Sequence, residues 1–277
     1  MWGARADAHP ASTLRTVIHT PYCAAMPSDT IDLNADVGES YGNWSMGDDA
    51  AMLDVVTSAN IACGFHAGDP LTIRRTVRLA ADRGVVIGAH VSYPDLVGFG
   101  RRTIEIEPDA LEADVLYQLC ALAGICRTSG TSVRYLKAHG ALYHRTATDP
   151  VQAEAVVQAL LAFDPRLPIL CSGRGVIGDI ARAHGVVVID ECFADRAYRP
   201  DGTLVPRAEP GAVHHDPSVV AAQALSLRDT GRFGSICLHG DTPGAVLHAR
   251  AVRDALIGAG TRIVAFVADP ALAPRVP

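Results

Sequence analysis

Short apolar runs alternate along the chain with longer amphipathic stretches, beginning at residue 31. The apolar runs are rich in β-branched residues, which favour buried strands, and the longer stretches are rich in Ala, Leu, Arg and Glu, which favour helices. The runs predicted to be strands are "IDLNAD" (31–36), "SANIACG" (58–64), "VVIGAHV" (85–91), "VRYLKAHG" (133–140), "PILCSG" (168–173), "VVVIDECFAD" (186–195), "SICLHGD" (235–241) and "TRIVAFVA" (261–268). The stretches predicted to be helices are 46–57, 70–83, 108–129, 150–163, 175–184, 217–229 and 243–259.

This alternation predicts the fold class. Strands that alternate with helices pair in parallel through crossover connections, so the sequence indicates an α/β fold. Seven or eight such units in one chain favour a (β/α) barrel over an open sheet, which usually needs fewer strands. No linker interrupts the series, and the one long loop is 196–217. We therefore predict a single barrel domain over residues 31–277.

The first 30 residues differ from the rest of the chain. They show no periodicity, and they contain no apolar segment long enough for a secretory signal. Their Arg, Ser and Thr content faintly suggests a transit peptide, whereas Met26 suggests a start codon closer to the first strand. We predict that residues 1–30 are a disordered tail, or that they are present because the sequence begins at a start codon upstream of the one at Met26.

Composition narrows the class of protein. Hydrophobic residues make up 49% of the chain and charged residues 19%, which is typical of a compact globular protein. The net charge of −6 argues against a broad surface for nucleic acid or anionic membranes. No apolar run approaches the roughly 20 residues that a membrane span needs. The seven cysteines form no C-x-x-C pair, so we expect reduced core cysteines and a cytoplasmic protein.

Polar residues gather where the predicted strands end. In a (β/α) barrel these C-terminal strand ends carry the chemistry. Four of the eleven histidines follow or end different strands: His66, His90, His139 and His239. One such histidine alone is usually a core residue with satisfied hydrogen bonds, but four at one rim favour a functional site.

Two of these histidines lie in segments that echo each other, "GFHAGDPLTIRRTV" (64–77) and "CLHGDTPGAVLHAR" (237–250). Each places a histidine after a strand, then Gly-Asp, then a proline that opens a helix. Because aspartate before proline is a common helix N-cap, Asp69 and Asp241 have a capping interpretation as well as a functional one.

Lys137 is the only lysine among the 24 lysine and arginine residues. It lies two residues before His139, on the same face of a predicted strand. Lysine is a compact donor whose pKa shifts readily on burial, unlike arginine. We therefore predict a functional lysine rather than a stray one on a solvated edge.

A glycine motif offers a competing function. Gly173, Gly175 and Gly178 form G-x-G-x-x-G after a strand, and Asp190 ends the next strand, as in a dinucleotide-binding fingerprint. The motif occurs in the fifth unit of a repeating series rather than in the first unit of a Rossmann half. We therefore expect turn glycines or an anion-binding turn rather than a nicotinamide site. The sequence contains no P-loop, nucleophile elbow or H-E-x-x-H motif.

Six motifs in order give the chain a family resemblance: "IDLNADVGES", "SANIACGFHAGDP", "GVVIGAHVSYPDLVGFGRR", "YLKAHGALYH", "ECFADRAYRPDGTLVPR" and "CLHGDTPGAV". Together they resemble the LamB/YcsF family, the A-type subunits of 5-oxoprolinase, from about residue 31 to 260. The resemblance implies a distorted (β/α) barrel of the glycoside hydrolase/deacetylase type. It also implies ATP-dependent opening of the 5-oxoproline lactam to L-glutamate, together with separate subunits B and C.

The resemblance also implies a set of site residues. Those expected to be catalytic are Asp36, His66, Lys137, His139 and His239. Those expected to bind substrate are Glu39, Asp69, His90, Asp195, Arg196, Arg207 and Asp241. The family commonly has proline where this chain has Ala138, and the stretch before "SICLHGD" is shorter than usual.

Lactam opening fits these side chains. If the lactam oxygen is phosphorylated, the reaction needs a base for water, a cation for the developing charge and an acid for the departing nitrogen. Asp36 or a rim histidine would be the base, Lys137 the cation, and His139 or His239 the acid. ATP is expected as a cofactor of the complex, and without a P-loop here a partner is the better candidate to use it.

Two alternatives stay open. Aspartate and histidines on barrel strands could instead bind a divalent metal and activate water, as in a metal-dependent deacetylase or amidohydrolase. The chain could also be a non-catalytic, metabolite-binding subunit that completes the site of a partner.

Overall fold

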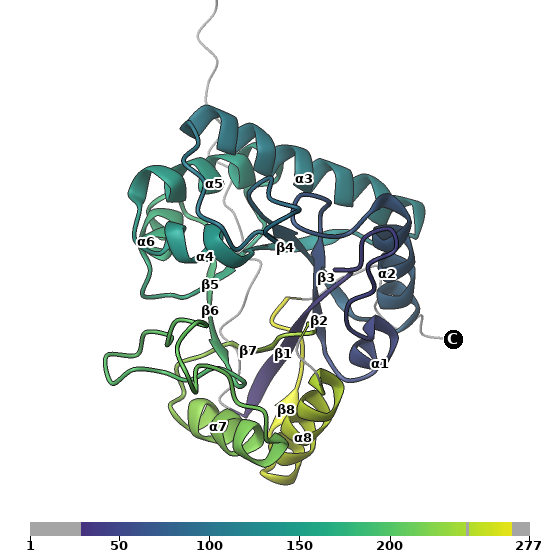
Figure 1. Ribbon diagram of the computed structural model, residues 1–277, viewed down its shortest axis with the longest axis vertical. Helices are drawn as coiled ribbons and strands as arrows, with labels where there is room; N and C mark the ends of the chain where they lie inside the picture. The colour runs from purple at the N-terminus through teal and green to yellow at the C-terminus, as the bar shows by residue number, and fades with distance from the viewer. Residues whose placement is uncertain (1–28, 242–243, 268–277) are drawn as a thin grey trace, which may run out of the picture.

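The computed structural model describes residues 29–241 and 244–267 (Figure 1). The tail predicted at residues 1–30 lies, except for its last two residues, outside the described residues, and so does Met26. Within the described part, β1 (Thr30–Val37) opens the first of the predicted repeating units.

Seven parallel strands close into a barrel, as the alternation predicts (Figure 1). The sheet runs β2-β3-β4-β5-β6-β7-β1 and closes because β1 also pairs with β2. An eighth short strand pairs with the start of β1. The strands after β1 are β2 (Ser58–Ala62), β3 (Val86–Val91), β4 (Val133–Ala138), β5 (Ile169–Cys171), β6 (Val188–Phe193), β7 (Ser235–Leu238) and β8 (Arg262–Ile263).

Helices connect the strands and surround the barrel (Figure 1). They are α1 (Asp49–Leu53), α2 (Pro70–Asp82), α3 (Pro108–Thr128), α4 (Gly140–Thr146), α5 (Pro150–Phe163), α6 (Val176–Ala183), α7 (Pro217–Asp229) and α8 (Ala245–Gly258). Three of them, α2, α5 and α7, begin at a proline and are capped by the preceding aspartate, as the Asp-Pro signal predicts. Helix α4 was not predicted from the sequence, because it is only 7 residues long and follows β4 with His139 alone between them, inside the predicted strand over 133–140.

The prediction of a last strand over 261–268 is largely wrong. Of the described residues in this range, 261–267, only Arg262 and Ile263 pair as a strand. The apolar residues that follow instead pack beneath the barrel, where Phe266 and Val267 join Val86, Tyr135, Leu170 and Ile189 in one cluster. The apolar pattern there arises because these side chains fill the N-terminal end of the barrel.

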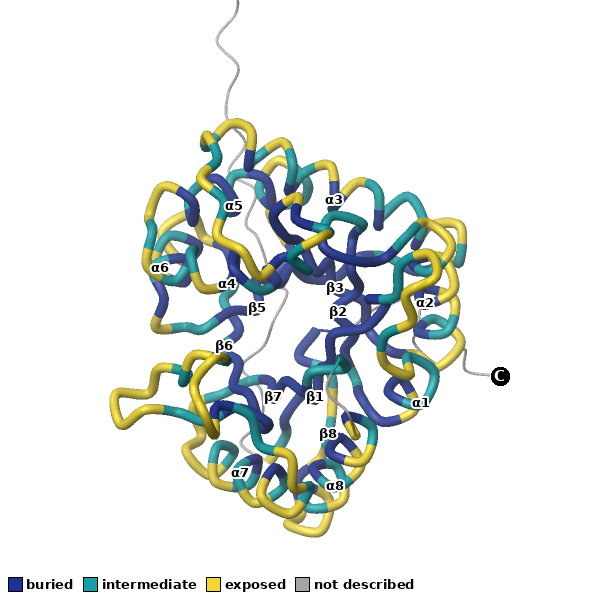
Figure 2. The backbone as a smooth tube through the Cα atoms, viewed as in Figure 1, coloured by how far each residue is buried: buried dark blue, intermediate teal, exposed yellow. Residues whose placement is uncertain are grey.

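The centre of the molecule is buried and its outer helical faces are exposed (Figure 2). The main apolar core lies between the strands and the helices. The six described cysteines are free, and five of them are buried. In the described part of the chain, no helix has both the length and the apolar character needed to cross a membrane.

Polar side chains occupy the barrel interior above the apolar cluster. Asp32 accepts hydrogen bonds from Thr57, Ser58 and Ser235. Its burial raises its pKa to about 6, although these three hydroxyl donors oppose the shift. This layer holds the strands that carry the residues of the rim, by which we mean the C-terminal strand ends and the segments directly after them.

Candidate active site

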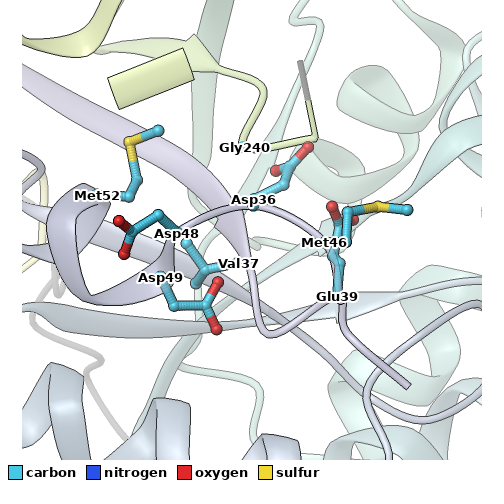
Figure 3. A pocket seen from close by; sticks show the side chains of 9 residues that line it. Asp36, Val37, Glu39, Met46, Asp48, Asp49, Met52 and Gly240 are labelled. Carbon is cyan, nitrogen blue, oxygen red and sulfur yellow. The ribbon is translucent and has the colours of Figure 1, made fainter. Parts of the chain in front are cut away.

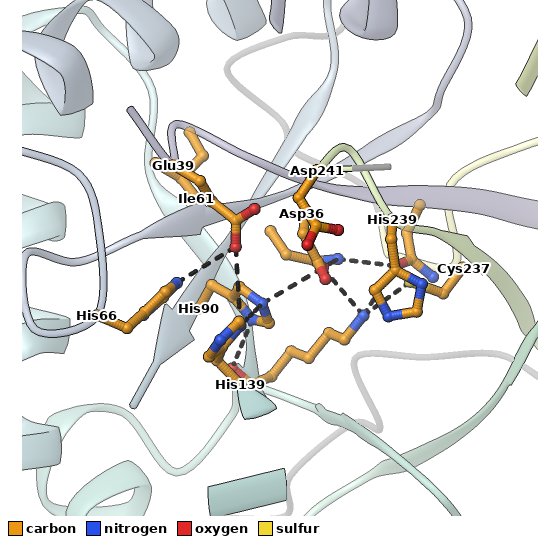
Figure 4. A network of polar contacts seen from close by, with 12 residues as sticks. Asp36, Glu39, Ile61, His66, His90, His139, Cys237, His239 and Asp241 are labelled. Carbon is orange, nitrogen blue, oxygen red and sulfur yellow. Dashed lines mark hydrogen bonds and ion pairs between the residues drawn. The ribbon is translucent and has the colours of Figure 1, made fainter. Parts of the chain in front are cut away.

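The rim brings together side chains that are far apart in the sequence (Figure 4). Asp36, His90 and Lys137 lie on β1, β3 and β4, while Glu39, His66, His139 and His239 follow the strands. Parallel strands end at the same side of a barrel, which explains this convergence. The four rim histidines do meet at one end of the barrel, but they form two groups with different partners.

The first group, here called the His–Glu cluster, comprises Glu39, His66, His90 and His139. All four are buried, and one ligand atom from each lies within 4.8 Å of the others. His66 Nε2 lies 3.3 Å from Glu39 Oε1, and His139 Nδ1 lies 3.7 Å from the same oxygen. His139 Nδ1 is 3.1 Å from His90 Nε2. The residue types and their proximity mean that this cluster could hold a metal ion.

Backbone groups and ring packing fix the orientation of the cluster. His139 Nε2 donates to the Phe99 carbonyl at 2.8 Å, and His90 Nδ1 faces the Lys137 carbonyl at 3.3 Å. His66 and His139 are stacked with ring centroids 3.8 Å apart. Gly100, with φ of +65°, brings the backbone against this stack, where a Cβ would lie 2.7 Å from His139 and 2.9 Å from His66.

Burial sets the protonation of this cluster. It lowers the pKa of His66 well below the usual value, and the neighbouring His139 lowers it further. Burial and His90 likewise hold the pKa of His139 well below its usual value. Burial and the nearby Asp36 raise the pKa of Glu39 well above the ordinary range. His66 and His139 are therefore neutral imidazoles near neutral pH.

Lys137 is buried among acidic groups. Its Nζ lies 3.2 Å from Asp36 Oδ1, 3.0 Å from Glu191 Oε2 and 3.0 Å from Cys237 Sγ. Burial alone would lower the pKa of Lys137, but Asp36, Cys237 and Glu191 outweigh it and raise the pKa well above the ordinary value. The only lysine of the chain is therefore a fixed cation, and the solvated-edge alternative is wrong because 2% of its side chain is exposed.

Asp36 joins Lys137 to the His–Glu cluster. Its Oδ1 accepts from Asn60 Nδ2 at 2.8 Å and lies 3.4 Å from His90 Nε2. Burial would raise the pKa of Asp36, but His90 and Lys137 lower it well below the usual range. Asp36 and Glu39 also line a small pocket beneath the loop that leads to α1 (Figure 3).

His239 forms the second group. Its Nδ1 lies 2.8 Å from Asp195 Oδ2, and its ring stacks on Phe193. Burial would raise the pKa of Asp195, but His239 outweighs that effect and the pKa is lowered. His239 thus contacts a carboxylate whose pKa is lowered, whereas the carboxylate of the His–Glu cluster, Glu39, has a raised pKa.

A cationic cleft connects the two groups. Its lining contains Arg101, Arg196, Arg207, Lys137, His139 and His239. Arg196 is buried and is anchored by donating to the carbonyls of Ala212 and Val205. Arg101 pairs with Asp241. The three guanidinium groups give this cleft the charge to receive a carboxylate.

The two aspartates suspected of capping differ. Asp69 caps α2, because its Oδ1 accepts from the backbone N–H groups of Leu71 and Thr72. Its Oδ2 accepts from Thr72 Oγ1 and Gly42 N, so its polar contacts lie outside the His–Glu cluster. Asp241 caps no helix: α8 begins after Gly244, and Asp241 pairs with Arg101 instead.

The glycine motif forms a turn and the start of α6. Gly175 is the N-cap of that helix. The Gly173 N–H donates to Asp190, and a Cβ on Gly173 would lie 2.5 Å from the Asp190 carboxyl carbon. A carboxylate thus already occupies the position over the turn where a phosphate would bind, which favours turn glycines over an anion site.

Sequence reasoning did not select several residues of this site. Glu191 and Cys237 contact Lys137, and the Phe99 carbonyl orients His139. Arg101 lines the cleft. Glu191 is an acidic residue inside a predicted strand (186–195) and so carried a usable signal, and Arg101 follows a glycine-rich loop. The role of Phe99 rests on its backbone, which no residue pattern reveals.

Comparison with known proteins adds to this geometry. The model of the LamB/YcsF family matches residues 31–270. The chain is 54% identical over 248 residues to a 5-oxoprolinase A-type subunit of Pseudomonas syringae pv. tomato, an alignment that covers 85% of this chain and 97% of that one.

Solved structures agree with the fold. The lactam utilization protein from Thermus thermophilus superposes with a TM-score of 0.81 and 42% identity, covering 85% of this chain and 99% of that chain. A peptidoglycan deacetylase of Bdellovibrio bacteriovorus superposes with a TM-score of 0.50 and 14% identity, covering 91% of this chain and 58% of that one. At this identity the second similarity concerns the fold alone, and it agrees with the expected deacetylase-like barrel.

Proposed function

The chain belongs to the LamB/YcsF family, and we propose that it is the A-type subunit of an ATP-dependent 5-oxoprolinase that opens 5-oxo-L-proline to L-glutamate. The observation that carries this proposal is the buried Lys137 cation beside neutral histidines, at the edge of a cleft lined by three arginines. This arrangement supplies a cation, bases and a carboxylate-binding surface in one place. A relative that is 54% identical bears the name of a 5-oxoprolinase A-type subunit.

Substrate recognition is assigned to the cationic cleft. 5-Oxoproline carries one carboxylate, and guanidinium groups bind carboxylates through paired hydrogen bonds. Arg207 and Arg101 line the cleft and are only partly buried, so they can reach a ligand. Arg196 is tied to two carbonyls and therefore adds positive charge from a fixed position. Asp195 and Asp241 act by orienting His239 and Arg101.

The catalytic roles follow from charge. Lys137 faces the cleft as a fixed cation and would stabilise negative charge that develops on the lactam oxygen. Asp36 is a weak base because its pKa is held low, so we assign the activation of water to a histidine of the cleft, His139 or His90. His239, with Asp195 at its Nδ1, would protonate the departing nitrogen. His66 orients Glu39.

Opening of a lactam to glutamate is uphill enough to need coupling to ATP. The chain carries no P-loop, and the glycine turn is occupied by Asp190. We therefore propose that subunits B and C complete the enzyme and that the complex uses ATP. We also propose that the reaction takes place in the cytoplasm.

The test is release of glutamate from 5-oxoproline, measured with this chain alone and with candidate subunits B and C, each with and without ATP. We expect turnover only when all subunits and ATP are present. His139→Ala should abolish it in the complete system. His184→Ala is the matched control, because His184 lies at the surface near Glu154, away from the cleft, and should leave turnover unchanged.

Full ATP-independent turnover by this chain alone would contradict the proposal. ATP-independent hydrolysis of another amide would favour the second candidate, a metal-dependent amidohydrolase, which the His–Glu cluster supports. Unchanged turnover of the complex with His139→Ala and Lys137→Arg would favour a non-catalytic subunit.

A further inference from the structure

We propose that His90, His139 and Glu39 form an open three-ligand site for a divalent transition metal such as zinc, with His66 orienting Glu39 rather than binding the ion. The inference goes beyond the proposed function and does not rest on it, because metal binding is measured without substrate. It stands on the atoms that face one another inside the His–Glu cluster (Figure 4).

The rings of His90 and His139 meet through the nitrogens that do not face a carbonyl. A carbonyl oxygen only accepts hydrogen bonds, so Nε2 of His139, facing Phe99, and Nδ1 of His90, facing Lys137, carry protons. The other two nitrogens, His139 Nδ1 and His90 Nε2, lie 3.1 Å apart. Each is a ring nitrogen through which an imidazole can bind a metal ion.

Two carboxylates surround the same contact. Glu39 Oε1 lies 3.7 Å from His139 Nδ1, and Asp36 Oδ1 lies 3.4 Å from His90 Nε2. Two ring nitrogens and two carboxylate oxygens thus converge in a buried place, and these are the atom types that bind zinc in proteins. Metal-bound histidines usually donate their second ring N–H to a backbone carbonyl or carboxylate, and both rings here are held by carbonyls.

The spacing fits a metal ion. Zinc binds nitrogen and oxygen at about 2.0–2.2 Å in tetrahedral geometry, which separates neighbouring ligand atoms by about 3.3–3.6 Å. The observed separations of 3.1 Å between the two histidine nitrogens and 3.7 Å from His139 to Glu39 bracket this range. Two imidazoles and a carboxylate favour zinc-type ions over magnesium or calcium, which prefer oxygen ligands.

His66 is excluded from the ligand set by its geometry. Its ring is stacked on His139 with an interplanar angle of 6°, so an ion in the plane of one ring lies outside the plane of the other. Its Nδ1 has no hydrogen-bond partner among the described residues. If His66 Nε2 bound an ion, the proton of the ring would be on Nδ1, which would then be a buried donor without an acceptor. If His66 Nε2–H instead donates to Glu39, Nδ1 is only an acceptor without a donor.

Asp36 is also excluded, because its Oδ1 already accepts from Asn60 and Lys137. Three protein ligands leave a coordination position open, which is the arrangement of catalytic rather than structural zinc sites. Both histidine ligands line the cationic cleft, so the open position would face it.

The experiment measures binding of Zn²⁺ and Co²⁺ to the purified full-length chain after chelator treatment, by calorimetry and by the visible spectrum of bound Co²⁺. We expect one ion per chain, with Mg²⁺ and Ca²⁺ failing to compete. His90→Ala and His139→Ala should each weaken metal binding more than about a hundredfold, because each removes a ligand. Loss of a residue that only orients a ligand costs about 10- to 100-fold in metal affinity. His66→Ala should weaken it about 10- to 100-fold while the stoichiometry remains one.

His239→Ala is the matched control, because it removes a rim histidine outside the cluster and should leave metal affinity unchanged. Circular dichroism must show that each variant is folded. For a variant that does not fold, Asn at the same position replaces Ala. Failure of the folded parent chain to bind either ion would overturn the proposal and leave a shared proton as what separates the two nitrogens. Binding that survives both His90→Ala and His139→Ala would place the ion elsewhere and also overturn it.

Discussion

The two echoing segments, residues 64–77 and 237–250, share a motif but not a role. In the first, His66 stacks on His139 and faces Glu39, while Asp69 caps α2. In the second, His239 pairs with Asp195, and Asp241 pairs with Arg101 instead of capping. The same residues in the same order therefore give a ring stacked on another histidine in one place and a ring that contacts an aspartate in the other.

The difference lies in what the rest of the chain brings to each segment. His66 is close to two other imidazoles, and burial lowers the pKa of both His66 and His139. His239 contacts Asp195, which follows β6, and this contact lowers the pKa of the aspartate. A residue pattern shows where a histidine lies, and its neighbours decide its protonation.

Of the variants that test the difference between the two segments, His139→Ala is expected to have the largest effect on the rate of glutamate release by the complete 5-oxoprolinase system. Loss of a general base costs typically about 10²–10⁴-fold in rate, so we expect glutamate release to fall by about a thousandfold. The fold should persist, because rim residues carry little of the barrel core. Near-normal glutamate release from an unstable variant would show that His139 is structural. His66→Ala should also lose activity, through misorientation of Glu39.

The second largest loss of rate is expected from Lys137→Arg. Lys137 contacts Asp36 on the side of the His–Glu cluster and Cys237 on the strand that leads to His239. A guanidinium is a wide planar fork that cannot occupy this buried place without displacing its neighbours. We expect about 3 kcal/mol of lost transition-state stabilisation, or about a hundredfold in rate. Arg75→Lys on the exposed face of α2 is the control. Activity above half of the parent's would make the only lysine incidental.

Asp195→Asn tests the ion-paired group. Removing a charged hydrogen-bond partner should cost about 2 kcal/mol of unfolding free energy at pH 7. Because the pKa of Asp195 is lowered in the folded state, its contribution is present above its ordinary pKa near 4 and is lost as pH falls through the folded pKa. Urea unfolding at several pH values should show the parent and the variant converging below about pH 4. A constant difference would contradict the pairing.

The smallest expected effect is a difference in stability loss between variants of Asp69 and Asp241. Asp69→Ala should cost about 1 kcal/mol of stability, because it removes an N-cap. Asp241→Ala should cost no more than about 0.5 kcal/mol, since its pair with Arg101 is partly exposed. It should instead raise the KM for 5-oxoproline by freeing Arg101. Urea unfolding and kinetics of the two variants decide this, and equal stability losses would refute the difference.

Much of the fold was predictable because it depends on local patterns. The alternation of strands and helices indicated the barrel, and Asp-Pro marked the starts of α2, α5 and α7. Residues 261–268 were misinterpreted, because an apolar run that fills a barrel end has the same composition as a strand. Helix α4 was missed, because it is only 7 residues long and starts where the predicted strand over 133–140 was still expected to run.

For the site, the sequence by itself determined which side chains reach the rim, since parallel strands all end on one side and their last residues can be read from the pattern. Only the tertiary structure decided how those side chains are paired. Glu39 was brought to His66 and His139, Asp195 to His239, and Glu191 to Lys137 by separate segments of the chain. The lowered pKa values of His66 and His139 follow from burial and from these distances, because electrostatic energies depend on separation and desolvation rather than on position in the sequence.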